Sequence, residues 1–193
     1  MASAAIEIPR RRLPRKEREE LMLQAAGRAF AARGFHAASM DAIAADAGVS
    51  KPMLYRYFGS KEQLYAAYVR ATGNELVDRI RAPETRGQPA DVRLRAGLRA
   101  FLSYVAARRA GWAVLHSETT APTHAAIARE VAELRERIIR ILITLFDDEP
   151  FAHAFAGAAE SLATWWATKP HRSLDEATEI LMRIAAAAPG SKR

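Results

Sequence analysis

The side chains best suited to chemistry in this sequence gather between Ser39 and Lys61, in the stretch SMDAIAADAGVSKPMLYRYFGSK. Lys51, Tyr55 and Arg56 carry hydrogen-bond donors, which can reach the phosphate oxygens or the base edges of a nucleic acid. A short helix that presents such donors on one face fits the major groove of DNA. The stretch therefore predicts a DNA-reading surface, although a single surface lysine or arginine is more often only a solvated charge.

Two short helices and a tight turn would have to position these donors. Ser39 is a favourable N-cap for a first helix that Gly48 ends, and Ser50 is a favourable N-cap for a second helix. Leu54 and Phe58, four residues apart, would form the buried face of that second helix. This arrangement predicts a helix-turn-helix, in which the second helix enters the major groove.

The remainder of the chain also favours helices. Alanine is abundant and alternation of polar and apolar residues is nearly absent, so we predict an all-α protein of about nine helices. One helix should run from Arg15 to Arg33 and end at Gly34, and another should run from Ser60 to about Arg81. After a proline-rich linker, further helices are predicted at 91–108, 111–118, 122–146, 150–167 and 173–187.

These elements divide the chain into three predicted parts. Residues 1–14 contain two prolines and a triple arginine, and we expect a disordered basic arm there. Its Arg10, Arg11 and Arg12 could enter the minor groove, or could only raise solubility and non-specific affinity. Residues 15–62 would form the helix-turn-helix domain, and residues 63–193 would form a larger helical domain.

The composition narrows the class of protein. The net charge of +7 is compatible with a nucleic-acid partner. There is no cysteine, so disulfides and thiolate metal sites are excluded. The longest apolar stretch, 138–146, contains Arg140 and is too short to span a membrane, and the N-terminus lacks the apolar core of a signal peptide. We therefore expect a soluble, cytoplasmic protein without a membrane partner.

The stretch from about Arg15 to Leu64 resembles the DNA-binding domain of the TetR family of bacterial transcriptional regulators. The matching motifs are FAARGF, SMDAIA, AGVSK and LYRYFGSKE. The resemblance implies a homodimer that binds double-stranded, pseudo-palindromic operator DNA. Arg56 occupies a variable position of the motif and is our candidate for operator-specific readout. The other implied phosphate or base contacts are Ser39, Ser50, Lys51, Pro52, Tyr55, Tyr57 and Lys61.

Two of these positions depart from the family pattern. Pro52 stands where a glycine is common, which bears on how closely the backbone approaches DNA. Tyr57 stands where histidine is frequent, and its hydroxyl preserves a phosphate contact. The resemblance further implies that residues 63–193 bind a small-molecule effector, which moves the helix that begins at Ser60, and that they form the dimer.

The region after residue 91 carries no catalytic motif such as G-x-S-x-G, a glycine-rich phosphate loop or H-E-x-x-H. We therefore predict no enzyme activity and no cofactor. His116, Glu118 and His124 lie close in sequence, but their spacing is not that of a known metal site, and we predict none. Aromatic side chains on neighbouring helices could line an effector pocket or form an ordinary core. These candidates are Phe101, Tyr104, Trp112 and His116.

The last two predicted helices carry more apolar surface than one small helical hairpin easily buries, and interfaces favour the aromatic residues found there. The TetR resemblance implies dimerisation through these helices as a four-helix bundle, while packing within the subunit is the alternative. The predicted dimer interface comprises Phe155, Leu162, Trp165, Trp166, Ile180, Leu181 and Ile184.

These observations together predict a ligand-responsive transcriptional repressor that is released from its operator by a small-molecule effector. An activator of the same fold is one alternative. A helical small-molecule-binding protein or an enzyme, with an incidental basic domain, is the alternative from a different class.

Overall fold

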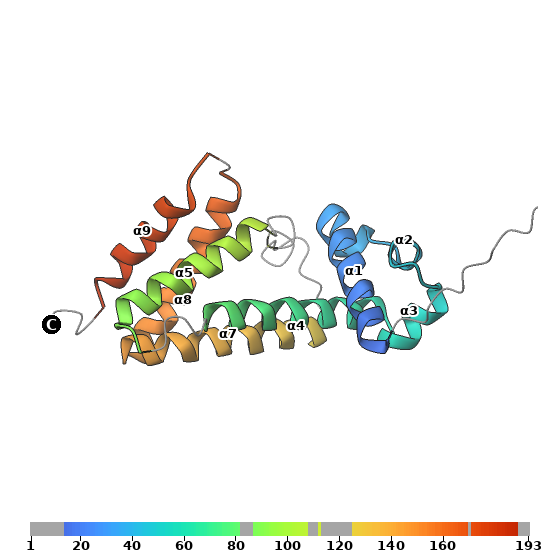
Figure 1. Ribbon diagram of the computed structural model, residues 1–193, viewed down its shortest axis with the longest axis horizontal. Helices are drawn as coiled ribbons and strands as arrows, with labels where there is room; N and C mark the ends of the chain where they lie inside the picture. Colours follow the sequence, from blue (N-terminus) through green and yellow to red (C-terminus); the bar gives the residue numbers. More distant parts are fainter. Residues whose placement is uncertain (1–13, 82–86, 108–111, 113–124, 170, 189–193) are drawn as a thin grey trace, which may run out of the picture.

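The computed structural model describes residues 14–81, 87–107, 112, 125–169 and 171–188. These residues form eight α-helices and no strand, so the predicted all-α class is confirmed (Figure 1). The predicted helix at 111–118 lies outside the described residues except for Trp112. The helices are α1 (Arg15–Ala37), α2 (Met40–Asp46), α3 (Lys51–Phe58), α4 (Lys61–Ile80), α5 (Ala90–Ala107), α7 (Ala125–Phe146), α8 (Glu149–Ala167) and α9 (Leu174–Ala185).

In the N-terminal part, glycines lie at the predicted turns and adopt backbone angles that these turns require. Gly34 interrupts α1 with φ 72°, and beyond it Phe35 packs on Phe30 with ring centroids 6.0 Å apart. Gly48 has φ 67° in the turn between α2 and α3, a conformation that side chains with a Cβ rarely adopt. The Ser50 side chain accepts a hydrogen bond from the Met53 backbone N–H at the start of α3.

The N-terminal core is a cluster of buried side chains from α1 to α4, with aromatic rings at its centre. Phe30 meets Tyr65 edge to face, with ring centroids 4.8 Å apart and an interplanar angle of 90°. Leu54 of α3 and Ile43 of α2 are fully buried in the same cluster, which fixes the two short helices against α1 and α4. Ile127, from the first turn of α7, is also part of this core.

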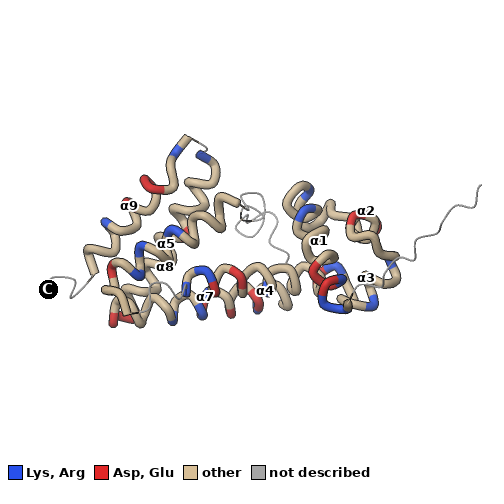
Figure 2. Tube along the Cα trace, viewed as in Figure 1, with Lys and Arg blue, Asp and Glu red and all other residues tan. Residues whose placement is uncertain are grey.

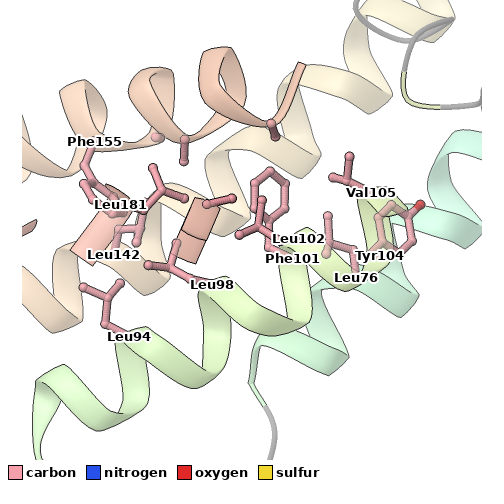
Figure 3. Close-up of a cluster of buried hydrophobic side chains, with 14 of the residues drawn as sticks. Leu76, Leu94, Leu98, Phe101, Leu102, Tyr104, Val105, Leu142, Phe155 and Leu181 are labelled. Carbon is pink, nitrogen blue, oxygen red and sulfur yellow. The ribbon is translucent and has the colours of Figure 1, made fainter. Parts of the chain in front are cut away.

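The C-terminal core joins the second half of α4 to α5, α7, α8 and α9 (Figure 3). Phe155, Trp166 and Leu181 lie inside it, each 3% exposed or less. The Trp166 indole N–H also donates to the carbonyl of Arg172, 3.0 Å away within the same chain. Within the single chain these three residues of the predicted dimer interface are thus buried in its own core, and their contact with a partner subunit stays a prediction.

Helices α4 and α7 connect the two cores side by side (Figure 1). They run in the same direction, since residues 70, 73 and 74 of α4 contact residues 130, 134 and 137 of α7 in that order. Both helices begin in the N-terminal core and continue into the C-terminal core. Among the helices described, none is both long and apolar enough to cross a membrane.

Candidate DNA-reading face and ligand cavity

The outer face of α3 carries the residues predicted to read DNA. Lys51, Pro52, Tyr55 and Arg56 are exposed, while Leu54 anchors the opposite face in the N-terminal core. A helix of eight residues with one buried and one donor-bearing face can lie in a major groove without disturbing its own support. The donors on α3 are therefore accessible on the face away from Leu54, and their contacts with DNA stay predictions.

The two predicted capping serines are the N-cap residues of α2 and α3, but only the Ser50 side chain accepts a capping hydrogen bond. Ser39 is partly buried with an extended backbone, and Ser50 is exposed. Helix N-termini of this kind favour phosphate oxygens. Their predicted contacts with DNA stay predictions.

Lys51 is held by an acidic neighbour, Asp41, that is not among the predicted site residues. Its Nζ lies 2.9 Å from Oδ2 of Asp41, in the first turn of α2. This hydrogen bond raises the pKa of Lys51, so the side chain stays positively charged. Asp41 thereby orients the ammonium group but also offsets its charge, and a DNA phosphate would compete with the Asp41 carboxylate.

Tyr57 connects α3 to the beginning of α1. The Arg18 guanidinium donates a hydrogen bond to the Tyr57 hydroxyl at 3.4 Å, and the Arg15 guanidinium lies 5.6 Å from the centre of the ring. Arg15 and Arg18 are not among the predicted site residues, although they are three residues apart on one helix face. They bring two further cationic side chains beside the reading helix. Figure 2 shows Lys and Arg positions along both α1 and α3.

Lys61 makes contacts inside the protein that bear on its predicted phosphate contact. Its Nζ donates to the carbonyl oxygens of His36 and Ala38, at 3.0 Å and 3.1 Å, and lies 4.8 Å from the centre of the Phe35 ring. An ammonium group has three donors, so two are already in use. Lys61 therefore joins the end of α1 to the start of α4, and only one donor is left for DNA.

A cavity of about 560 Å³ lies between α4, α5, α7 and α8. Phe101, Tyr104 and Trp112, three of the four predicted pocket residues, line it, while His116 lies outside the described residues. The volume is within the range of ~300–1,000 Å³ that is typical of small-molecule sites. Further apolar lining residues are Val69, Leu76, Leu98, Leu134, Ile138 and Phe155.

Trp112 is fixed at the cavity wall by two contacts. Its ring meets that of Phe101 at 74°, with centroids 5.3 Å apart, and its indole N–H donates to the Thr164 hydroxyl at 3.1 Å. Charged residues also reach the cavity, namely Arg81, Arg93, Arg135 and Glu160. No periodic pattern in the sequence marks these four, because Arg81 follows α4 while the others come from α5, α7 and α8, and they meet only in the folded chain.

The described residues contain no group of three metal-ligating side chains. The three residues considered for such a site, His116, Glu118 and His124, lie outside the described part of the chain.

Part of the predicted dimer surface remains accessible. Trp165 is 43% exposed and Ile184 is 37% exposed, and both are among the largest exposed apolar residues of the described chain. Leu162 and Ile180 are half-buried. These four residues, on α8 and α9, are the members of the predicted interface that a partner subunit could contact.

Comparison with known proteins agrees with this geometry. Residues 22–68 match the family described as "Bacterial regulatory proteins, tetR family", and residues 90–188 match "Tetracyclin repressor-like, C-terminal domain". The second match alone covers just over half of the 193 residues. The chain belongs to the TetR family. The first match spans the helix-turn-helix, and the second spans the helices from α5 onward that contribute to the cavity.

Regulators described as HTH-type are among the similar proteins. The transcriptional activator FasR of Mycolicibacterium smegmatis is 45% identical over 94 residues, which cover 49% of this chain and 43% of FasR. An uncharacterised HTH-type regulator of Mycobacterium tuberculosis is 30% identical over 156 residues, covering 76% of this chain and 67% of that one. The chain thus matches less than half the length of FasR.

A solved structure supports the fold over nearly the whole chain. A TetR-like transcriptional regulator from Rhodococcus sp. RHA1 is 38% identical, with a TM-score of 0.74, and the match covers 90% of this chain and 96% of that protein. The TetR-family chain described here is therefore a transcriptional regulator by family.

Proposed function

We propose that this TetR-family protein is a transcriptional repressor that binds a pseudo-palindromic operator as a homodimer and is released by a small-molecule effector. The observation that carries the proposal is the position of Val69. This α4 residue is buried in the N-terminal core, which holds α3, and it also lines the cavity. A ligand in the cavity therefore contacts a helix that supports the DNA-reading face.

The effector would act by preferring one conformation of the protein. A ligand shifts an equilibrium only by the difference in its affinity for the two states. Moving the protein from almost fully DNA-competent to almost fully DNA-incompetent requires a preference of about 5.5 kcal/mol. Since α4 and α7 both line the cavity and both reach the N-terminal core, a ligand that separates them would reposition α3.

The homodimer would use the exposed residues of α8 and α9, with Trp165 at its centre. A two-fold dimer places its two reading helices about 34–36 Å apart, in successive major grooves. Replacing Trp165 by glutamate should give monomers in analytical ultracentrifugation, because the charge would be buried at the interface. A dimer that persists would place the interface on another surface.

The sign of regulation has a second candidate. FasR, the relative that is 45% identical over 94 residues, is named a transcriptional activator. A reporter gene placed downstream of the operator DNA that the protein binds separates a repressor from an activator. When the protein is supplied, a repressor lowers expression of the reporter and an activator raises it.

DNA binding is tested by selecting sites from a random pool of duplexes with the full-length protein. We expect an inverted repeat whose half-sites are about one helical turn apart. Arg56→Ala should then cost ~1–3 kcal/mol on the selected site and relax the preference at one base position. An equal loss on every sequence would remove Arg56 as a base reader.

The alternative from another class is a helical small-molecule-binding protein or an enzyme whose N-terminal part is incidental. A DNA-binding protein contacts phosphates with cationic side chains and thereby releases counterions from the DNA. The logarithm of its affinity for DNA should therefore fall linearly with the logarithm of the salt concentration. Absence of any salt-dependent DNA binding would favour that alternative.

A further inference from the structure

We propose that the cavity binds an amphipathic acid, a linear aliphatic chain that ends in a carboxylate or phosphate, with the anionic end held by Arg81 and Arg93. This inference rests on the proposed function, because it names the chemical class of the effector. It follows from the way in which charge and hydrogen bonds are distributed along the cavity.

The cavity has two distinguishable ends along α4. Val69 lies at the end next to the N-terminal core, and Arg81, just past the last turn of α4, lies at the far end. Helix α5 begins at that far end and runs back, since a Cβ placed on Gly97 would be 3.4 Å from Cγ2 of Ile80. Arg93, in the first turns of α5, therefore belongs to the same end as Arg81.

Two neutral polar groups that line the cavity away from these arginines, on Thr72 and Trp112, are already hydrogen-bonded. The Thr72 hydroxyl donates to the backbone carbonyl of Tyr68 at 2.9 Å, and the Trp112 indole N–H donates to Thr164 at 3.1 Å. A polar group of a ligand placed there would have to displace one of these hydrogen bonds. This part of the cavity thus offers little to a ligand's charged end.

The charged side chains of the cavity are not all balanced. The Arg135 guanidinium lies 3.5 Å from the Glu160 carboxylate, so these two charges offset one another. Within the described part of the chain, neither Arg81 nor Arg93 has an acidic partner. A guanidinium stays protonated, and its planar donors match a carboxylate or phosphate. Two uncompensated arginines at one end therefore favour an anionic group there.

Most of the side chains that line the wall between these ends are apolar. Leu76, Leu98, Ile138, Leu142 and Phe155 are typical of it, and none can accept or donate a hydrogen bond. Burying an unpaired hydroxyl or amide against such a wall is unfavourable, which disfavours a sugar, nucleoside or peptide. An aliphatic chain has no such groups, so it can follow this wall from the arginines towards Val69.

The class is tested by isothermal titration of the full-length protein with probes that share a chain and differ in the end group. The probes are myristate, tetradecyl phosphate, tetradecanol and tetradecyltrimethylammonium, all below their micelle concentrations. We expect the carboxylate or the phosphate to bind at least tenfold more tightly than the alcohol and the cation. Whichever anion binds more tightly distinguishes a free fatty acid from a phosphate-bearing lipid. Lengthening the acid from laurate to myristate should tighten binding by up to about fourfold per methylene.

The binding site is tested with the double substitution Arg81→Gln and Arg93→Gln, which should weaken binding of the preferred anion at least tenfold and leave tetradecanol unchanged. Arg79→Gln is the matched control, because Arg79 is also on α4 but pairs with Glu75 at 2.8 Å and does not line the cavity. Its affinity for the anion should equal that of the wild type.

Three results would overturn the inference. They are equal binding of the alcohol and the anions, unchanged anion affinity in the double variant, or no binding of any probe by a protein that still binds its selected DNA. Each of these leaves DNA binding and dimerisation intact. The proposed function would instead fail if the wild-type protein did not bind DNA, whatever the probes did.

Discussion

The two hydrophobic cores share α4 but are filled to different degrees. In the N-terminal core, Phe30 packs against Tyr65 and Phe35, with ring centroids 4.8 Å and 6.0 Å away. In the C-terminal core, Phe101 and Phe155 instead reach the wall of a cavity of about 560 Å³. A filled core holds α3 in one orientation, whereas a core with a cavity can admit a ligand. DNA reading and ligand sensing thus call for opposite packing at the two ends of one helix.

The largest expected difference comes from removing one phenylalanine from each core. Phe30→Ala should lower the free energy of unfolding by ~3–5 kcal/mol, because the ring is 1% exposed and packs against the rings of Phe35, Tyr65 and Tyr68. Phe101→Ala should cost about 3 kcal/mol or less, since part of its surface already faces the cavity and has fewer contacts to lose. Urea denaturation of both variants measures the difference.

Equal losses would contradict the comparison, since they would mean that the two rings are equally well packed. Ligand binding gives a second measurement of the difference between the two cores. Phe101→Ala enlarges the cavity and should alter effector affinity. Phe30 does not line the cavity, so Phe30→Ala should leave effector affinity unchanged.

A second pair of substitutions adds a methyl group to each region. A Cβ at Gly27, in the N-terminal core, would lie 2.5 Å from Cε2 of Tyr68, whose ring is held beside Phe30 and Tyr65. Gly27→Ala should therefore cost about 1–2 kcal/mol, the overpacking penalty less the helix propensity gained. A Cβ at Gly73 would lie 2.9 Å from a methyl group of Leu134, which lines the cavity.

Because Leu134 has room to turn into the cavity, Gly73→Ala should stay within about 1 kcal/mol of the wild-type stability. Its effect should appear in function, as weaker effector binding and an altered affinity for operator DNA. Fluorescence polarisation with labelled operator, with and without effector, measures both. A Gly73→Ala protein that is destabilised as much as Gly27→Ala would show that the α4–α7 contact is packed as tightly as the N-terminal core.

The smallest expected difference concerns ion pairs. Arg70 of α4 hydrogen-bonds Glu130 of α7, whose side chain is 11% exposed, while Arg28 and Asp46 pair on the surface of the N-terminal part, 60% and 50% exposed. Glu130→Gln should cost about 1 kcal/mol, and Asp46→Asn a few tenths, because solvent screens the exposed pair. Denaturant titrations at low and high salt measure these values.

The Glu130 pair also predicts a pH dependence. The hydrogen bond from Arg70 lowers the pKa of Glu130 below its ordinary value of 4.5. The folded state therefore favours the ionised carboxylate, so this contribution is present above pH 4.5 and is lost as the pH falls below it. The difference in stability between wild type and Glu130→Gln should shrink in that acidic range. A constant difference would show that the substitution acts through packing.

Local features of the fold were predictable from the sequence because they depend on neighbours along the chain. Gly34 and Gly48 adopt the positive φ expected of glycines at helix ends. The Ser50 and Ser60 side chains each accept a hydrogen bond from a backbone N–H three residues on, as favourable N-caps do. The predicted end of the helix before Asp147 agrees with the last residue of α7.

Contacts between distant residues were not predictable in this way. Lys51 and Lys61 are both predicted DNA contacts, but their partners Asp41 and His36 depend on how α1, α2 and α4 pack. Similarly, Trp165 and Trp166 are predicted to lie in one interface, although adjacent helical residues point about 100° apart. Only the packing of α8 against α5 and α7 decides that Trp166 is buried and Trp165 exposed.

The insertion of Ile127 into the N-terminal core has a consequence for protein engineering. Ile127 is 4% exposed and lies among side chains that are at least 58 residues earlier in the chain, such as Val69. A fragment that ends after α4 would lack Ile127, so the space it fills in the N-terminal core would be empty and apolar surface would be exposed. Chimaeras that exchange operator specificity between relatives should therefore transplant two pieces, the residues up to α4 and the first turn of α7. A junction placed only at the end of α3 or α4 would combine the N-terminal core of one relative with the first turn of α7 from another, and the residue at position 127 would not match that core.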